Sequence, residues 1–212
     1  MGQTYPAGEV ANPSPRPDAW SSVPTTRGKI VLNVGCGYPL RQKLHPHFHG
    51  SDWREIRLDL DPEVRPDIVC SITDMSPVAS ATIDAIWSSH NLEHLQRHEV
   101  PSALAEFFRV LKPCGFLLLT LPDLQDVARL VVEDRLEDQA YASSSGPITA
   151  LDMIFGHTAS LARGNSFMAH RTGFTARTLQ KVLAEAGFFR ITVRRGSAFD
   201  LWATAFRPAA AG

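Results

Sequence analysis

Short apolar runs alternate with polar segments that contain glycine or proline, and this pattern predicts an alternating α/β fold. Largely apolar runs predict strands at 30–34, 55–60, 67–71, 84–88 and 115–121. The run at 115–121 is apolar at nearly every position, which is typical of a central parallel strand buried on both faces. We therefore expect a single doubly wound domain with a parallel sheet at its centre.

Apolar residues spaced three or four positions apart predict amphipathic helices between these strands. We expect a short helix from Leu40 to about Pro46, a helix over about 99–111, and a helix between the capping residue Thr175 and Gly187. Another helix is expected after the capping residue Asp123, and its apolar stripe consists of Leu124, Val127, Ala128 and Val131. The final strands, 190–194 and 199–206, have no helix between them and are expected to pair antiparallel.

The two ends of the chain and one internal stretch lack this periodicity. Residues 1–27 are rich in proline and are expected to form a flexible arm, and 207–212 a frayed tail. The domain would then span 28–206, with an insert over about 123–173. Within the insert, 140–173 is rich in Ser, Gly and Pro, and we expect an irregular lid there.

The first strand ends in a glycine turn that suggests a ligand site. Gly35 and Gly37 flank Cys36, and Pro39 can open a helix. About twenty-two residues after Gly37, a second strand ends at Asp59, where an acid can accept hydrogen bonds from ribose hydroxyls. Asp61 is the alternative position for that acid. Together these features predict a cofactor that contains adenosine.

Composition narrows the class of protein further. The chain has 212 residues, 44% apolar content and a net charge of −1, which fits a globular domain without a basic surface for nucleic acid. No apolar run is long enough to span a membrane. The three cysteines show no metal-like spacing and no disulfide framework, so we expect a cytoplasmic protein. The oligomeric state stays open.

An ordered set of motifs resembles the class I S-adenosylmethionine-dependent methyltransferases, and among them the small bacterial type 11-like group. The matching segments are 31–37, 58–59, 84–88, Asn91–Leu95 with its Glu-His-Leu signature, and 106–115 with Arg-Val-Leu-Lys-Pro-x-Gly. The resemblance implies a Rossmann-like, mostly parallel seven-stranded sheet of order 3-2-1-4-5-7-6 with helices on both faces. S-adenosylmethionine would lie across the ends of the first, second and fourth strands.

The resemblance also implies which residues contact the cofactor. These are Asn33, Gly35, Cys36, Gly37, Asp59, Leu60, Ser71, Ile72, Asp74 and Ser88. The chain departs from the family pattern at Asn33, where an acid is usual, at Pro39, where a third glycine is frequent, and at Ser71, the usual place of the acid that binds adenine. Thr73 and Asp74 follow Ser71 closely and could compensate.

The expected reaction is transfer of a methyl group to a small molecule. His90, His157 and His170 are the candidate bases, because neutral imidazole is available at physiological pH. Arg171 and Phe174 are candidate contacts for the acceptor. We predict no metal site, and we interpret His45, His47 and His49 as part of a solvated loop.

Three alternative functions are compatible with parts of this pattern. An NAD-dependent dehydrogenase shares the strand, glycine and acid pattern, but its third glycine would fall at position 40, where this chain has Leu40. The substitutions at Asn33 and Ser71 motivate a non-catalytic cofactor-binding module. A protein or nucleic-acid methyltransferase is the third alternative, which the balanced charge disfavours for nucleic acid.

Overall fold

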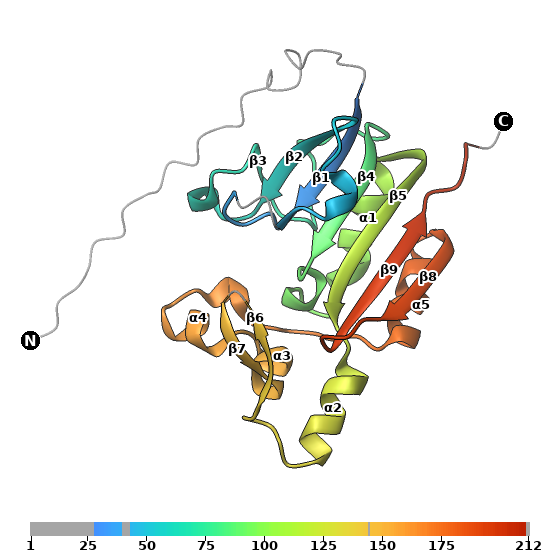
Figure 1. Ribbon diagram of the computed structural model, residues 1–212. Helices are drawn as coiled ribbons and strands as arrows, with labels where there is room; N and C mark the ends of the chain where they lie inside the picture. The colour runs from blue at the N-terminus through green and yellow to red at the C-terminus, as the bar shows by residue number, and fades with distance from the viewer. Residues whose placement is uncertain (1–27, 40–42, 144, 211–212) are drawn as a thin grey trace, which may run out of the picture.

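The computed structural model describes residues 28–39, 43–143 and 145–210. The predicted arm over 1–27 and the start of the helix expected from Leu40 lie outside these residues. A seven-stranded sheet of order β3-β2-β1-β4-β5-β9-β8 forms the centre of the molecule (Figure 1). Its strands are β1 (Lys29–Val34), β2 (Trp53–Asp59), β3 (Ile68–Val69), β4 (Ile83–Ser89), β5 (Leu111–Pro122), β8 (Phe189–Arg195) and β9 (Asp200–Phe206). This confirms the predicted fold class. It also confirms the predicted order 3-2-1-4-5-7-6, because β8 and β9 are the sixth and seventh strands of this sheet along the chain.

The order of the sheet reverses at β1, and this reversal determines where a ligand can bind. β1 pairs in parallel with β2 on one side and with β4 on the other. Only β9 runs against its neighbours, β5 and β8. In open α/β sheets, ligands bind beyond the carboxyl ends of the strands at such a reversal. The ends of β1, β2 and β4 are therefore the expected binding region.

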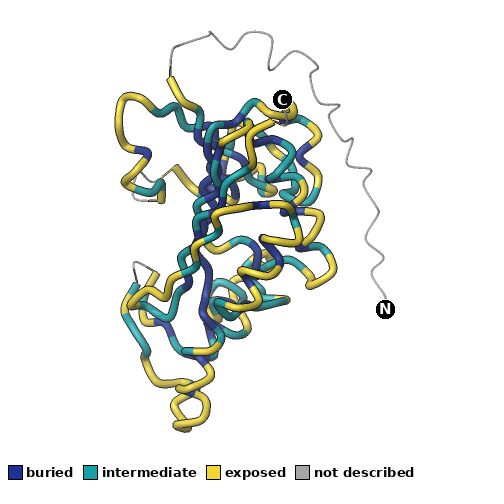
Figure 2. The backbone as a smooth tube through the Cα atoms, turned by 90° about the vertical axis from the view of Figure 1, so that its right-hand side faces the viewer, coloured by how far each residue is buried: buried dark blue, intermediate teal, exposed yellow. Residues whose placement is uncertain are grey.

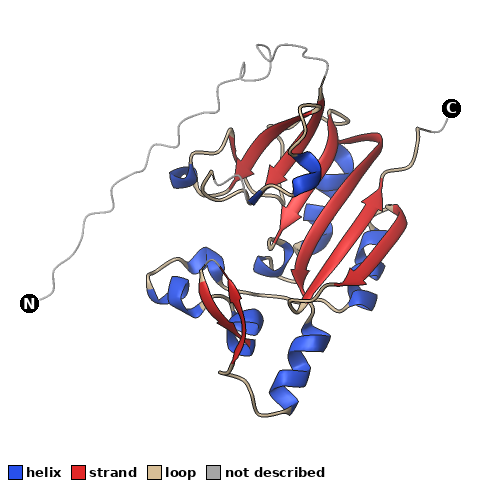
Figure 3. Cartoon of the chain, viewed as in Figure 1, coloured by secondary structure: helices blue, strands red, loops and turns tan. Residues whose placement is uncertain are grey.

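The two faces of the sheet are covered differently (Figure 3). The helices α1 (Val100–Val110) and α5 (Ala176–Glu185) bury the main core through side chains such as Leu104, Phe107 and Leu183. On the other face, a smaller cluster consists of Val31, Phe48, Ala85 and Trp87. Phe48 belongs to the 3-10 helix η2 (Pro46–Phe48), so Pro46 begins a helical turn rather than ending a helix.

The insert is more regular than its sequence indicates. It contains α2 (Leu124–Val132), the hairpin β6 (Gln139–Ser143) and β7 (Gly146–Thr149), α3 (Ala150–Phe155), α4 (Thr158–Ala162) and η5 (Ser166–Met168). These elements lie beyond the arrowheads of β1, β4 and β5 (Figure 1). They pack around their own small core of Val127, Leu130, Ile148, Ala150 and Met153. The expectation of an irregular 140–173 was therefore wrong.

Two further details correct the expectations. On α2 the buried residues are Val127 and Leu130, whereas Val131 is 43% exposed, so the predicted stripe was displaced around the helix. The end of α2 and the turn that follows it, together 131–138, are almost entirely exposed (Figure 2). Arg207, assigned to the frayed tail, is held by a hydrogen bond from its backbone N–H to Gly115 O and lies over the ring of Phe108. Within the described residues, no helix combines the length and apolar character needed to span a bilayer.

Candidate functional site

The glycine turn after β1 adopts the backbone conformation that glycine was expected to provide. Gly35 and Gly37 both have φ of +58°, in the left-handed region that side chains disfavour. A Cβ atom at Gly35 would lie 1.6 Å from Asn91 Oδ1. Position 35 therefore admits only glycine while Asn91 keeps its place.

Asn91 joins the ends of the two central strands. Its Nδ2 donates hydrogen bonds to Val34 O at 2.9 Å, to Ser88 Oγ at 3.2 Å and to Ser89 O at 3.2 Å. Ser88 is buried, and its hydroxyl accepts a hydrogen bond from this amide. Its expected contact with the cofactor stays a prediction. In the sequence Asn91 stands out only as part of a motif, so its structural role was not predicted.

The two candidate ribose acids differ clearly in their surroundings. Asp59 Oδ2 accepts a hydrogen bond from Gly37 N at 2.8 Å, and Oδ1 accepts one from Asp61 N at 3.0 Å. Asp61 instead caps η3 (Pro62–Val64) by accepting from Glu63 N at 2.9 Å. A carboxylate offers about four acceptor positions, so Asp59 retains capacity for ribose hydroxyls. Asp59 remains the predicted ribose ligand.

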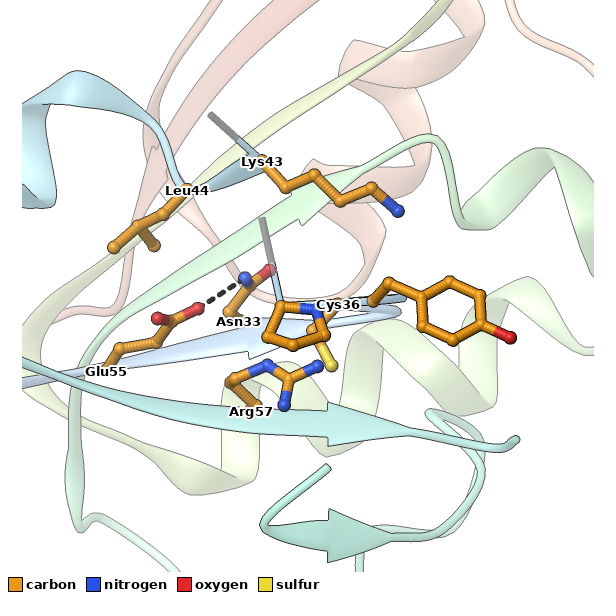
Figure 4. A pocket seen from close by; sticks show the side chains of 8 residues that line it. Asn33, Cys36, Lys43, Leu44, Glu55 and Arg57 are labelled. Carbon is orange, nitrogen blue, oxygen red and sulfur yellow. Dashed lines mark hydrogen bonds between the residues drawn. The ribbon is translucent and has the colours of Figure 1, made fainter. Parts of the chain in front are cut away.

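Asn33 is paired with an acid on the neighbouring strand. Its Nδ2 donates to Glu55 Oε1 at 2.7 Å, and both side chains line a hollow of about 180 Å³ under the glycine turn (Figure 4). Arg57, also lining this hollow, donates to Val64 O and Arg65 O. Glu55 and Arg57 were missed. They precede Asp59 on β2 by four and two positions, so all three side chains lie on the same face of the strand. This spacing was the signal in the sequence that could have identified them.

Cys36, between the two glycines, is a packing residue in this structure. Its side chain is 3% exposed, and burial raises the pKa of its thiol to about 11. The thiol is therefore neutral at physiological pH. Its expected place beside the cofactor rests on the family resemblance.

The predicted adenine side is built from local turn contacts. Ser71 Oγ and Thr73 Oγ1 are 2.7 Å apart, and Asp74 Oδ1 accepts from Ser76 N at 3.1 Å. Leu60 is 52% exposed, whereas Ile72 packs partly against the main core. These positions follow β2 and β3 at the expected edge, and their contacts with the cofactor remain predictions.

A buried carboxylate and an exposed imidazole follow β4. His90 has φ of +55°, and its Nδ1 lies 3.0 Å from Oε1 of Glu93, whose side chain is 1% exposed. The loss of contact with water, complete for Glu93 and partial for His90, favours the neutral form of each group. The hydrogen bond and charge attraction between them outweigh burial, so the pKa of His90 is raised and the pKa of Glu93 is lowered. The pair therefore keeps Glu93 ionised and fixes the imidazole ring of His90.

His170, from the insert, joins this group. Its ring lies 4.9 Å from that of His94, measured between centroids. The backbone supports the contact, because Arg171 N donates to Glu93 O at 2.8 Å. The structure thus brings together His90, Glu93, His94 and His170, of which Glu93 and His94 were not proposed as site residues.

The other candidates of the insert lie differently. His157 contacts Ser160 Oγ through Nδ1 at 2.8 Å, and no described contact links it to His90 or His170. Phe174 is 1% exposed and packs in the main core, so it is a structural residue rather than an acceptor contact. Arg171 is exposed beside the site. In the 45–49 loop, His45 packs against Trp87 and His47 against Phe48, whereas His49 Nε2 lies 2.9 Å from Leu44 O.

Comparison with known proteins places this geometry in a family. Residues 32–119 match the model of the family described as a methyltransferase domain. No curated protein sequence gives a significant match. Several hundred solved chains match, and the three described below are 12–16% identical, which shows a common fold.

Three of these solved structures illustrate the likeness. A methyltransferase of Methanosarcina mazei is 16% identical with a TM-score of 0.56, and the match covers 87% of this chain and 94% of that one. The 1,6-didemethyltoxoflavin-N1-methyltransferase of Burkholderia thailandensis, with bound S-adenosylhomocysteine, is 16% identical over 86% and 72%, with a TM-score of 0.55. Phosphoethanolamine N-methyltransferase 2 of Haemonchus contortus is 12% identical with a TM-score of 0.53, and the match covers 87% of this chain but only 50% of that enzyme.

The sheet order and the glycine turn are those of the class I S-adenosylmethionine-dependent methyltransferase fold, and the family match lies on the same strands. The segment 32–119 belongs to the methyltransferase-domain family, and S-adenosylmethionine is the cofactor of this class. The dehydrogenase alternative is thereby set aside.

Proposed function

We propose that the protein transfers the methyl group of S-adenosylmethionine to a small-molecule acceptor. The observation that supports this best is the polar group at the end of β4, where buried Glu93 orients His90 and the insert adds His170. It lies at the strand ends where this fold binds ligands, and the insert provides a wall beside it.

The chemistry asks little of the protein beyond alignment. The reaction is an in-line displacement on a carbon that the sulfonium already activates, so holding donor and acceptor in line provides much of the rate. A weakly acidic acceptor also requires a base. His90 fits this role by geometry, because Glu93 holds Nδ1 and leaves Nε2 for the acceptor. His157, whose side chain contacts Ser160, is the weakest of the three candidates.

The small-molecule assignment rests on charge and on the neighbours. The net charge of −1 differs from the strongly positive charge that favours binding to nucleic acid. Two of the similar structures carry names of enzymes that act on small molecules, 1,6-didemethyltoxoflavin and phosphoethanolamine. We also propose the cytoplasm as the compartment, because Cys36, Cys70 and Cys114 are all free thiols.

Two measurements test this function. Calorimetry with S-adenosylhomocysteine and with NAD should show binding of the first compound alone. Methyl-labelled S-adenosylmethionine, incubated with the protein and a cell extract, should then place label in the low-molecular-weight fraction. Binding of NAD without binding of S-adenosylhomocysteine would contradict the cofactor, and label confined to protein or nucleic acid would contradict the acceptor class.

A further inference from the structure

Glu93, His94 and His170 form a cluster whose arrangement is not fully explained by the orientation of His90 by Glu93. Glu93 and His94 belong to the 3-10 helix η4 (Leu92–His94) directly after β4, and His170 lies on the chain that returns from the insert. One side-chain ligand atom from each residue lies within 4.8 Å of the other two. Two backbone hydrogen bonds, from Arg171 N and Thr172 N to Glu93 O, hold the two segments together.

The two imidazoles are already oriented as metal ligands usually are. His94 Nδ1 lies 3.1 Å from Ala169 O, and His170 Nδ1 lies 2.9 Å from Met153 O. A carbonyl oxygen only accepts, so each Nδ1 carries the hydrogen and each Nε2 presents a lone pair. Metal-binding histidines characteristically donate their other ring N–H to a carbonyl or carboxylate in this way.

The carboxylate of Glu93 has one oxygen without a protein partner. Oε1 is engaged by His90 Nδ1 at 3.0 Å, whereas Oε2 is buried and no donor among the described residues reaches it. Neutral imidazoles bonded to carbonyls through Nδ1 have no second hydrogen to donate to it. An unpaired oxygen of a buried carboxylate is costly, and a cation bound by Oε2 removes that cost.

We propose that Glu93 Oε2 and the Nε2 atoms of His94 and His170 bind one divalent transition-metal ion, with Zn²⁺ as the best match. Two imidazoles and one carboxylate form a known zinc ligand set that leaves a fourth position open, whereas Mg²⁺ and Ca²⁺ prefer sites made of oxygen ligands. Bonds of about 2.0–2.2 Å put the ligand atoms roughly 3.4 Å apart. The ligand atoms lie within 4.8 Å of one another in the structure and would move closer together when the ion binds.

The position of the ion suggests its purpose, which rests on the proposed function. The cluster lies at the end of β4 beside His90, so the open coordination position can take an oxygen of the acceptor. A bound cation lowers the pKa of such an oxygen and fixes its direction. His94 and His170 then act as ligands, and His90 remains the candidate base.

The test is direct metal binding to the full chain. Calorimetry with Zn²⁺ should give one ion per chain, and Co²⁺ should show the visible bands of a low-coordinate site. Glu93→Gln and His170→Gln should each weaken Zn²⁺ binding more than about 100-fold, because loss of outer-shell partners alone costs 10–100-fold. His98→Gln removes an exposed histidine near the same helix and serves as the matched control. It should leave binding unchanged.

Controls separate the site from the fold and from the cofactor. Circular dichroism checks that Glu93→Gln is folded, and His170→Gln provides a second variant from a different segment. Both variants should bind S-adenosylhomocysteine as the wild type does. Zn²⁺ binding that survives both substitutions, or that is lost instead on His47→Gln in the 45–49 loop, overturns the proposal. Metal binding without cofactor binding would contradict the proposed function and leave the metal site standing.

Discussion

At the residue scale, the role of each carboxylate near the glycine turn follows from the hydrogen-bond donor that it accepts from. Asp59 receives the N–H of Gly37 and so fixes the glycine turn. Glu55 receives the amide of Asn33, the position where the family usually carries an acid. A carboxylate at position 33 would be repelled by the like charge of Glu55. The amide of Asn33 is therefore compatible with Glu55, and the acid of this region lies on β2 instead of β1.

Asp59→Ala should weaken binding of S-adenosylhomocysteine by at least tenfold. A carboxylate that accepts from ribose hydroxyls forms charge-assisted hydrogen bonds worth about 1.5–3 kcal/mol each. Calorimetry measures the change, and Asp61→Ala is the control, because Asp61 caps η3. Weaker binding in Asp61→Ala together with normal binding in Asp59→Ala would place the ribose acid two residues further along.

Sequence reasoning found the part of the site that is local in the chain. Gly35, Gly37 and Asp59 belong to a strand-turn-strand pattern whose backbone needs are visible in the sequence. The cluster of Glu93 and His170 was not predictable, because its members come from distant segments. Only the path of the insert, with His170 hydrogen-bonded back to Met153, brings them together.

The central strands of the sheet were predictable because each one is buried between two neighbouring strands. The nearly continuous apolar runs of β1, β4 and β5 are typical of strands that are buried on both faces. The hairpin β6–β7 and the helix α3 are short and half-buried, so their patterns are weak. On α2 the buried face turns toward the small core of the insert, and the apolar residues alone did not indicate that direction.

Helix α3 provides a test of capping that depends on pH. Asp152 accepts hydrogen bonds from Thr149 N, Thr149 Oγ1 and Thr158 N. Burial opposes the charged form, but these bonds outweigh it and lower the pKa of Asp152 to about 2. A carboxyl whose pKa is lowered by folding stabilises the fold above its ordinary pKa, about 3.8, and this contribution is lost as the pH falls toward 2.

Asp152→Asn should therefore lower the free energy of unfolding at pH 7 by about 0.5–2 kcal/mol, and with it the midpoint of thermal unfolding. The difference from the wild type should shrink as the pH falls below about 4. Asp138→Asn is the control in the same insert, since the exposed pair with Arg135 contributes little. A difference that stays constant down to the acid limit would show that the charge of Asp152 is irrelevant.

At the scale of the whole molecule, the main core and the core of the insert are connected by two chain segments that lie side by side and cross at Asp123 and Phe174. The main core lies between the sheet and the helices α1 and α5, and the insert has a separate small core. The chain enters the insert at Asp123 and leaves it at Phe174, and Leu124 N donates to Phe174 O at 2.9 Å. An insert with its own core and adjacent ends can move as a unit about that crossing.

We expect this unit to close over the acceptor region when the cofactor binds. The insert touches the end of β4 through the bonds of Arg171 N and Thr172 N to Glu93 O, so closure should reduce local opening there. Hydrogen exchange on the free protein and on the complex with S-adenosylhomocysteine measures this. Amides of 166–174 should gain protection, those of β9 should not, and Asp59→Ala at the same ligand concentration should abolish the gain. Equal protection in the free and bound wild type would contradict a lid and direct the search for the acceptor site to His90 and the N-terminal arm.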